Sequence, residues 1–188
     1  MTATLFLRQF LRNPRQISSI APSSSYLARA MAQGLSGDTG RVVEFGPGTG
    51  SLTEGILAAG VHPEDLTLFE LDEQFVTTLR QRFAGVTVLH APADKAAEHI
   101  VPGVGAVVSG LPLLSMPAEI CAAIVGAAFD ILAPGAPFIQ FTYGSKPSIP
   151  ASVVAALGLH AEQSAFVWCN LPPARVHRFT RARDRASA

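Results

Sequence analysis

The sequence has few cysteines and no long apolar run. It contains two cysteines among 188 residues, Cys121 and Cys169, and neither belongs to a C-x-x-C pair or has a histidine at ligand spacing. We therefore expect no metal site, and we expect both cysteines to be reduced residues of the core. The sequence also lacks a run of 18 apolar residues, so no segment of it predicts a membrane-spanning helix.

Acidic residues are absent from the first part of the chain. Residues 1–37 contain four arginines and no acid, residues 38–140 contain four bases and twelve acids, and residues 141–188 contain six bases and two acids. Net charge changes from +4 to −8 and back to +4 along a chain that is neutral overall. This distribution indicates an anionic partner at the ends of the chain. It does not favour a nucleic acid partner, because nucleic-acid enzymes are commonly basic overall.

The clearest positive signal is an apolar strand followed by alternating glycines, in the sequence VVEFGPGTGSLT at residues 42–53. Three glycines remove side chains where the backbone turns and a ligand approaches, and three hydroxyl residues are available to cap the next helix. The glycines are Gly46, Gly48 and Gly50, and the hydroxyl residues are Thr49, Ser51 and Thr53. Glu44 ends the strand at the sheet edge where open α/β folds bind ligands. The pattern predicts a nucleoside cofactor.

Glycine spacing separates this turn from the dinucleotide fingerprint G-x-G-x-x-G. The chain reads E-x-G-x-G-x-G and resembles motif I of the class I S-adenosylmethionine-dependent methyltransferases. That cofactor has a sulfonium, an amino acid end and a ribose but no phosphate, so an acidic neighbour is tolerable. The resemblance implies S-adenosyl-L-methionine as methyl donor and S-adenosyl-L-homocysteine as product. A dinucleotide site and a purely structural turn are the alternatives.

A second strand, predicted at 65–71, ends in acidic residues. Glu70 lies 24 positions after Gly46, about where doubly wound folds place the carboxylate that binds ribose hydroxyls. We predict that Glu70 binds the cofactor, with Leu71 beside it. Asp72 fits a helix N-cap better.

A third strand, at 86–90, leads to a second candidate for cofactor contact. The segment APAD at 91–94 looks like the family motif that contacts the adenine amino group through an acid. This resemblance implies that Asp94 and its neighbour Ala93 bind the cofactor. A helix cap is the alternative for Asp94.

Strands and helices alternate along the whole chain. The strands are expected at 41–46, 65–71, 86–90, 105–109, 136–143, 162–169 and 174–181, and the helices at 51–59, 73–83, 93–99, 117–132 and 150–157. This order predicts an α/β, Rossmann-like fold with a seven-stranded, mostly parallel sheet and helices on both faces. We expect N-terminal lid helices over 1–37, one cofactor-binding domain over 38–182 and a tail at 183–188.

The first thirteen residues predict an amphipathic helix. At 100° per residue one side is apolar and the other polar. The apolar side consists of Phe6, Leu7, Phe10 and Leu11, and the polar side of Arg8, Gln9, Arg12 and Asn13. Aromatic residues opposite arginines favour a helix in an anionic lipid interface. An amphipathic helix packed on the domain is the alternative.

The fourth strand ends in SGLPLL, residues 109–114, where the fold places the transferred methyl group. Adenine N6-methyltransferases, including the rRNA dimethyladenosine enzymes that motif I resembles, have Asn, Asp or Ser, then Pro, then an aromatic that stacks on a flipped base. This chain has Ser109, a predicted cofactor contact, but Leu113 and Leu114 in place of the aromatic. An apolar wall instead favours a lipid or a small amine.

Residues 5–182 resemble the bacterial phospholipid N-methyltransferases. The shared segments are FLRNP (10–14), SIAPSS (19–24), EFGPGTG (44–50), FE (69–70), SGLPLL (109–114), FTYG (141–144) and NLPPA (170–174). The resemblance implies stepwise methylation of phosphatidylethanolamine, through its mono- and dimethyl forms, towards phosphatidylcholine. It also implies a cytoplasmic protein bound peripherally to the inner face of the cell membrane, and we expect a monomer. An rRNA or small-molecule methyltransferase and a non-catalytic binding module are the alternatives.

An ethanolamine amine must lose a proton before it can attack a methyl group, since an ammonium has no lone pair. We predict that the proton acceptor is among three residues: Tyr26 in the N-terminal helical region, Tyr143 at the end of the fifth strand, and His177 on the last strand. Packing in a lid is the alternative for Tyr26, and a solvated strand position is the alternative for His177.

The anionic head group also needs a cation. Arg175 lies two residues before His177, so the two share a strand face, whereas Arg178 points to the opposite face. We predict that Arg175 binds the lipid phosphate, with Lys146 as a second contact. Leu111 is predicted to line the substrate site.

Overall fold

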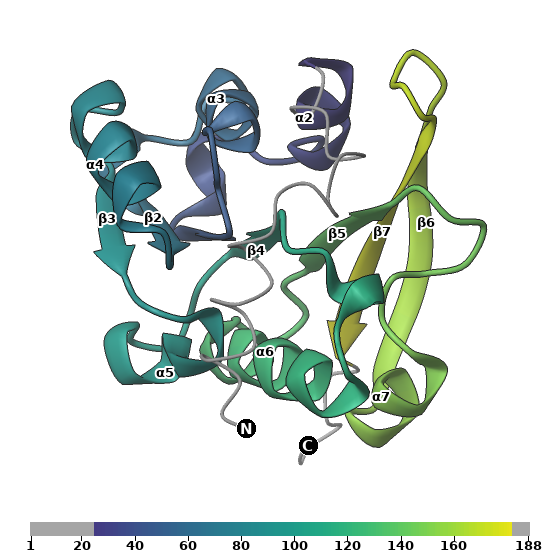
Figure 1. The fold of residues 1–188 in the computed structure, drawn as a ribbon. Coiled ribbons are helices and arrows are strands. Elements are labelled where there is room, and N and C mark those ends of the chain that lie inside the picture. Colours follow the sequence, from purple (N-terminus) through teal and green to yellow (C-terminus); the bar gives the residue numbers. More distant parts are fainter. Residues whose placement is uncertain (1–24, 182–188) are drawn as a thin grey trace.

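The computed structural model describes residues 25–181, which form a single mixed sheet with helices on both faces (Figure 1). The strands are β1 Val42–Phe45, β2 Leu66–Glu70, β3 Thr87–His90, β4 Ala106–Ser109, β5 Phe138–Thr142, β6 Leu159–Val167 and β7 Ala174–Arg181. The helices are α2 Ser25–Met31, α3 Ser51–Ala58, α4 Glu73–Arg82, α5 Ala96–His99, α6 Ala118–Ile131 and α7 Ala151–Ala156. Short 3-10 turns are η2 Gly37–Thr39, η3 Pro63–Asp65, η4 Ala93–Lys95 and η5 Leu113–Ser115.

The strands are ordered β3-β2-β1-β4-β5-β7-β6. The pairs within β1 to β5 are parallel, and β7 is antiparallel to both β5 and β6. The predicted fold class, with its seven-stranded and mostly parallel sheet, is confirmed. The chain reverses its direction across the sheet between β1 and β4, and this crossover point is where open α/β sheets bind ligands.

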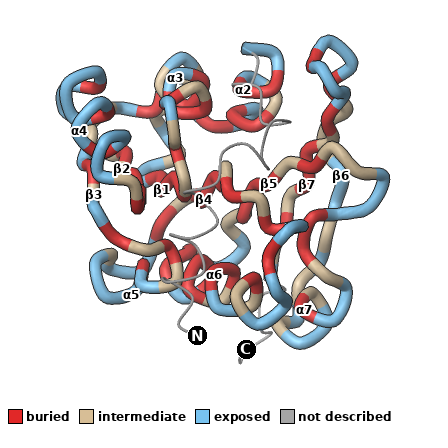
Figure 2. Tube along the Cα trace, in the orientation of Figure 1, coloured by how far each residue is buried: buried red, intermediate tan, exposed pale blue. Residues whose placement is uncertain are grey.

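Two apolar clusters cover the two faces of the sheet. In the first cluster, α5, α6 and α7 pack on one face of the sheet, against Val43, Phe45, Val107 and Phe138. In the second cluster, α2, α3 and α4 pack on the other face, against strand residues that alternate with these, such as Val42. The central strands are therefore buried on both faces (Figure 2), as expected for parallel strands between helical layers. Cys121 is buried in the first cluster, but Cys169 is exposed, because it lies in the turn between β6 and β7 rather than on a strand.

Local capping differs between α3 and α4. Asp72 caps α4 as predicted, accepting hydrogen bonds from the backbone of Gln74 and Phe75. The prediction that Thr49, Ser51 or Thr53 caps α3 is wrong. Gly50 occupies the N-cap position in the left-handed conformation, and no side chain caps the helix.

The described part of the N-terminal region packs closely on α3. Leu27, Ala28 and Met31 of α2 are buried in the second cluster. A Cβ atom added to Gly55 of α3 would lie 2.8 Å from the Ala28 backbone and side chain. Glycine at position 55 therefore allows the two helices to touch. Residues 1–24 and 182–188, which include most of the predicted lid segment and all of the tail, lie outside the described residues, so the domain division stays a prediction.

Residues 25–181 contain neither a membrane-spanning helix nor a cluster of metal ligands. None of their helices is both long enough and apolar enough to cross a bilayer. No group of three or more His, Cys, Asp or Glu side chains in this range could hold a metal ion.

Substitution of Gly55 tests the α2–α3 contact. Gly55→Ala should lower the free energy of unfolding by about 1–3 kcal/mol, because the new methyl group forces α2 away from its buried position. Gly126→Ala in α6 is the matched control, since an added Cβ there meets nothing within 4 Å. The control should be neutral or stabilising by less than about 1 kcal/mol. Urea unfolding of both variants measures the difference, and equal stabilities would contradict the packing assignment.

Candidate functional site

The carboxyl ends of four neighbouring strands bring most of the predicted cofactor residues to one edge of the sheet. In sheet order these strands are β3, β2, β1 and β4. Ala93 and Asp94 follow β3, and Glu70 and Leu71 lie at the end of β2. Glu44 and the glycine turn lie at the end of β1, and Ser109 ends β4. Phe45 is in register with both Phe69 and Ser109, so the three central strand ends are level.

The three glycines of the turn have different roles. All have positive φ angles. A Cβ on Gly46 would lie 2.5 Å from the Leu111 side chain, and one on Gly50 would lie 2.5 Å from the Phe83 ring. A Cβ on Gly48 would meet nothing within 4 Å. Close packing therefore requires glycine at positions 46 and 50, whereas of the three only Gly48 has open space in the direction of an added Cβ. Contact of the three glycines with the cofactor stays a prediction.

Glu70 connects the end of β2 to the glycine turn. One carboxylate oxygen accepts hydrogen bonds from the backbone N–H groups of Leu71 at 2.7 Å and Asp72 at 3.0 Å. The other accepts from the backbone N–H of Gly48 at 3.0 Å. The carboxylate is nearly buried and is held directly beside the open space at Gly48. This placement suits the predicted contact with a cofactor.

Glu44 is fully buried on β1. Thr53 Oγ1 of α3 donates a 2.7 Å hydrogen bond to Glu44 Oε2, so Thr53 binds the motif carboxyl instead of capping its helix. Glu44 Oε1 has no hydrogen-bond partner among the described residues. A buried carboxyl oxygen without a partner is costly, and a ligand donor is one way to satisfy it.

The electrostatic setting of Glu44 favours its neutral form. Burial raises its pKa to about 8, the hydrogen bond from Thr53 opposes that rise, and the charge of Glu70 adds to it. Two carboxyl groups at one sheet edge with no described cation paired to either are poised for a cationic ligand.

A clamp outside the turn holds its backbone. Arg82, the last residue of α4, donates a 2.6 Å hydrogen bond to the carbonyl of Thr49 and forms an ion pair with Glu54. The Thr49 side chain itself is exposed and lies 3.5 Å from the Ser51 hydroxyl. Sequence reasoning missed Arg82, because nothing local marks an arginine 33 positions away as a partner of the turn.

The loop after β4 lies against the glycine turn. The Leu111 N–H donates to Ser109 Oγ at 3.3 Å, and the Leu111 carbonyl accepts from Gln140 Nε2 at 2.9 Å. A Cβ on Gly110 would lie 2.6 Å from the Gly46 carbonyl oxygen. The loop is therefore fixed from two strands and in direct contact with the turn.

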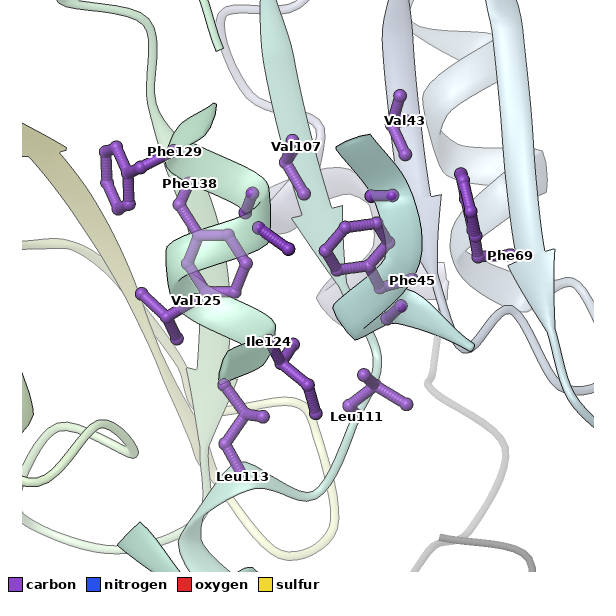
Figure 3. Close-up of a cluster of buried hydrophobic side chains, with 14 of the residues drawn as sticks. Val43, Phe45, Phe69, Val107, Leu111, Leu113, Ile124, Val125, Phe129 and Phe138 are labelled. Atoms are coloured by element: carbon purple, nitrogen blue, oxygen red, sulfur yellow. The ribbon is translucent and has the colours of Figure 1, made fainter. Parts of the chain in front are cut away.

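The leucines of this loop do not form one wall. Leu111 and Leu113 are buried beside Ile124 in the core (Figure 3), whereas Leu114 is exposed. Sequence reasoning also missed Gln140, which is almost fully buried on β5. Its signal was a single amide residue between apolar residues in the strand FIQFT.

The predicted adenine contacts lie at the far end of the cofactor edge. Ala93 is buried in the core cluster, and Asp94 is half-buried in η4, which packs on α6. Leu71 is buried, and its carbonyl lies 3.0 Å from the His90 ring nitrogen Nε2. Their contact with the cofactor stays a prediction.

The predicted acceptor residues are divided between the two faces of the sheet. His177 is buried, which excludes the solvated alternative, and burial lowers its pKa with a further contribution from Arg175. Arg175 stacks on the Phe166 ring at 4.6 Å and donates to the Gly144 carbonyl at 3.1 Å. Lys146 is exposed in the loop after β5.

The two tyrosines lie apart from His177. Tyr143 packs edge-on against Phe141 in the second cluster, on the opposite face of the sheet, and burial raises its pKa while a hydrogen bond with Asn170 opposes the rise. Tyr26 is exposed on α2. Arg175 and His177 therefore lie on the same face of the sheet, whereas the three predicted proton acceptors do not lie together.

Glu44 should make stability fall with increasing pH. The folded protein binds the Glu44 proton up to about pH 8, whereas the unfolded chain releases it near 4.5, so folding takes up a proton between these values. Relative to Glu44→Gln, the wild-type protein should lose up to about 1.4 kcal/mol of unfolding free energy per pH unit in this window. Urea unfolding at pH 5 to 9 measures it.

Glu64→Gln, at an exposed position in η3, serves as the control and should follow the wild-type curve. Parallel curves for wild type and Glu44→Gln would show that the buried carboxyl does not take up this proton.

Comparison with known proteins identifies relatives of two kinds. The ribosomal RNA adenine dimethylase family matches residues 3–94, slightly less than half of the chain. An ornithine lipid N-methyltransferase of Singulisphaera acidiphila is 33% identical over 147 residues, covering 73% of this chain and 76% of that protein. A ribosomal RNA small subunit methyltransferase A of Burkholderia multivorans is 46% identical over 52 residues, which is 27% of this chain and 19% of that protein.

Solved structures share the fold at low sequence identity. The 1,6-didemethyltoxoflavin N1-methyltransferase of Burkholderia thailandensis has a TM-score of 0.66 at 15% identity, covering 95% of this chain and 88% of that one. Magnesium protoporphyrin IX methyltransferase from Synechocystis has a TM-score of 0.59 at 15% identity, covering 78% and 73%. Together with the match to the lipid enzyme, which covers about three quarters of both chains, this places the chain among the class I S-adenosylmethionine-dependent methyltransferases, in the family of the ornithine lipid N-methyltransferase, with S-adenosylmethionine as its methyl donor.

Proposed function

We propose that this protein methylates the primary amine of a membrane lipid. Phosphatidylethanolamine, converted stepwise towards phosphatidylcholine, is the substrate that the sequence resemblance implies. Ornithine lipid is a second candidate, supported by the similarity to the ornithine lipid N-methyltransferase, which matches this chain over 76% of its length. That extended match is the observation that carries the proposal, since it includes more of the chain than the cofactor half alone.

The ribosomal RNA relatives support this function less well. The dimethylase match ends at residue 94, before β4 begins, so it covers the cofactor half of the sheet and not the residues after it. In the second half, Leu113 is a core residue and Leu114 is aliphatic, so neither offers the aromatic surface on which a flipped base stacks.

The residues at the sheet edge fit the cofactor. We assign Gly48 to the close approach of the ligand, Glu70 to the ribose hydroxyls, and Glu44 to the cationic end, because Glu44 Oε1 is buried without a partner. Asp94 and Ala93 are assigned to the adenine, and Ser109 to the wall of the site. S-adenosylmethionine supplies a methyl group whose carbon forms a bond to the amine nitrogen as its bond to sulfur breaks, with that electron pair remaining on sulfur.

The protein's own contribution is to bind and orient the amine lipid. Arg175 is suited to the lipid anion, because its guanidinium is fixed by Phe166 and the Gly144 carbonyl and retains further N–H donors. Phosphatidylethanolamine offers a phosphate and ornithine lipid a carboxylate, and a guanidinium binds either. Lys146 is an exposed second cation in the same loop region.

Exposed apolar side chains at this end of the sheet support a lipid surface. Trp168 and Leu171 lie in the turn between β6 and β7 and are 77% and 86% exposed, and Leu114 follows β4. The β6–β7 turn projects from the domain in Figure 1. Exposed tryptophan and leucine side chains are typical of contact with a membrane interface. We propose peripheral membrane association on the cytoplasmic side, with the predicted helix at residues 1–13 as a further contact, although that segment lies outside the described residues.

Labelled S-adenosylmethionine and defined liposomes test the function. The full chain should transfer label to phosphatidylethanolamine or ornithine lipid, and the ratio of the two rates identifies the preferred head group. Phosphatidylglycerol liposomes, which contain no amine, and a 16S rRNA fragment are the controls. Transfer to the RNA but to neither lipid would refute the proposal.

Arg175→Ala should raise KM for the amine lipid about tenfold or more while S-adenosylmethionine affinity changes little, since a charge-assisted hydrogen bond is worth about 1.5–3 kcal/mol. Arg181→Ala is the matched control, because Arg181 lies on the same strand and face, stacks on Phe129, and is at the other end of the strand. Equal effects of the two substitutions on KM would show that Arg175 does not bind the lipid anion.

A further inference from the structure

A row of polar side chains crosses three strands beneath the loop that follows β4. Ser109 on β4 is in register with Gln140 on β5, and Gln140 is in register with His177 on β7. Paired residues on adjacent strands point to the same face, here the one covered by α6. All three are buried. Polar side chains at three successive paired positions are unusual in a sheet whose buried positions are mostly apolar.

The orientation of Gln140 is fixed. Its Nε2 atom donates to the Leu111 carbonyl at 2.9 Å and to the Phe141 carbonyl at 3.2 Å, which uses both amide hydrogens. If the amide were rotated by 180°, Gln140 Oε1 would face these two carbonyl oxygens, which offer no hydrogen to accept. Nε2 is therefore the atom that faces the carbonyls, and Oε1 is the atom on the other side of the amide. Gln140 Oε1 is buried and has no donor among the described residues.

His177 presents a second atom of the same kind. Its Nδ1 is buried and has no partner within residues 25–181. Burial, and then the charge of Arg175, lower the pKa of His177, so the ring is neutral near pH 7 and Nδ1 accepts when Nε2 holds the proton. Directly opposed residues of an antiparallel pair have Cβ atoms about 4.5–5.5 Å apart, so the two side chains are neighbours.

We propose that Gln140 Oε1 and His177 Nδ1 together receive the N–H groups of the acceptor amine. The inference rests on the proposed function and specifies how its substrate is recognised. The pair lies next to the methyl-transfer edge, since Gln140 holds the carbonyl of Leu111 and the Leu111 side chain contacts Gly46. Both atoms are covered in this structure, so the amine reaches them only when the loops at this edge separate.

Two acceptors match a neutral primary amine. Such an amine has two N–H groups and one lone pair, so binding both N–H groups leaves only the lone pair free to face the methyl group. The surrounding burial also disfavours the charged ammonium. The proton that an ammonium must lose passes to His177 Nδ1 and then to solvent; after methyl transfer the new ammonium releases its extra proton by the same route.

The number of N–H groups falls with every methylation. A neutral monomethyl amine has one and a neutral dimethyl amine has none, so the pair orients the first substrate best and the third not at all. We therefore expect the protein to favour unmethylated lipid, with Gln140 and His177 as specificity-determining residues for the degree of methylation.

Kinetics with soluble short-chain lipids test whether the contribution of the pair falls with each added methyl group. Gln140→Met should lower kcat/KM about tenfold for dihexanoyl phosphatidylethanolamine, less for its monomethyl form, and less than about twofold for its dimethyl form. His177→Leu should show the same gradient, and His177→Asn, which keeps an acceptor near the position of Nδ1, should recover much of the loss.

Ser109→Ala is the control for a merely structural role. It removes the other side-chain contact to Leu111 without removing either free acceptor, so it should change all three substrates by one common factor. If Gln140→Met also changes all three by a common factor, Gln140 only anchors the loop and the proposal is wrong.

Calorimetry gives a measurement that does not depend on turnover. With S-adenosylhomocysteine present, the wild-type protein should bind dihexanoyl phosphatidylethanolamine at least about tenfold more tightly than dihexanoyl phosphatidylcholine, whose nitrogen has no N–H group. Gln140→Met should reduce this preference. Equal wild-type affinities overturn the pair's role without reference to any variant. If the preference and its loss are observed but the wild-type protein methylates no lipid, the acceptor pair stands and the proposed function fails.

Discussion

The contact between the turn after β1 and the loop after β4 is the constraint on which both halves of the site depend. The carbonyl of Gly46 leaves no room for a side chain on Gly110, and Leu111 leaves none on Gly46. The parallel strands β1 and β4 lie side by side here, at the crossover point where the order of the strands across the sheet reverses. A larger residue at either glycine would push the turn after β1 away from the loop after β4, so glycine at both positions is needed for this contact.

Buried polar groups lie on either side of that contact, and in the proposed function they bind the charged cofactor and the amine. Glu44 is kept without a full set of partners on one face, and Gln140 and His177 on the other. Each buried acceptor without a donor reduces the stability of the domain. No described lysine or arginine forms an ion pair with Glu44 or Glu70. A cationic ligand would therefore not have to displace an internal ion pair at either carboxyl.

The fold and the cofactor edge followed from the sequence because their signals are local. Alternating apolar segments gave the strands in the correct order, and Asp72 was recognisable as a helix cap from its position before α4. The distinct roles of the three glycines were not predictable, since they depend on Leu111 and Phe83, which reach the turn only through tertiary packing. Arg82 and Gln140 were missed for the same reason, because their partners lie 33 and 29 residues away. Thr53 was predicted to cap its helix because it lies near the helix start. Its actual hydrogen bond, from the hydroxyl to the buried Glu44 carboxyl on β1, cannot be recognised in the sequence.

The division of labour across the crossover point also accounts for the two kinds of relative. Strands β1 to β3 supply the turn, Glu70 and Asp94, and the match to ribosomal RNA dimethylases ends there. Strands β4, β5 and β7 supply Ser109, Gln140, Arg175 and His177, which the match to the dimethylase family does not reach. In the proposed function, enzymes with different acceptors share the cofactor half, and the residues that the second half places against Leu111 decide the acceptor. Because Gln140 both holds Leu111 and presents a free acceptor, a change at this one residue would alter the loop and the chemistry of the acceptor site together.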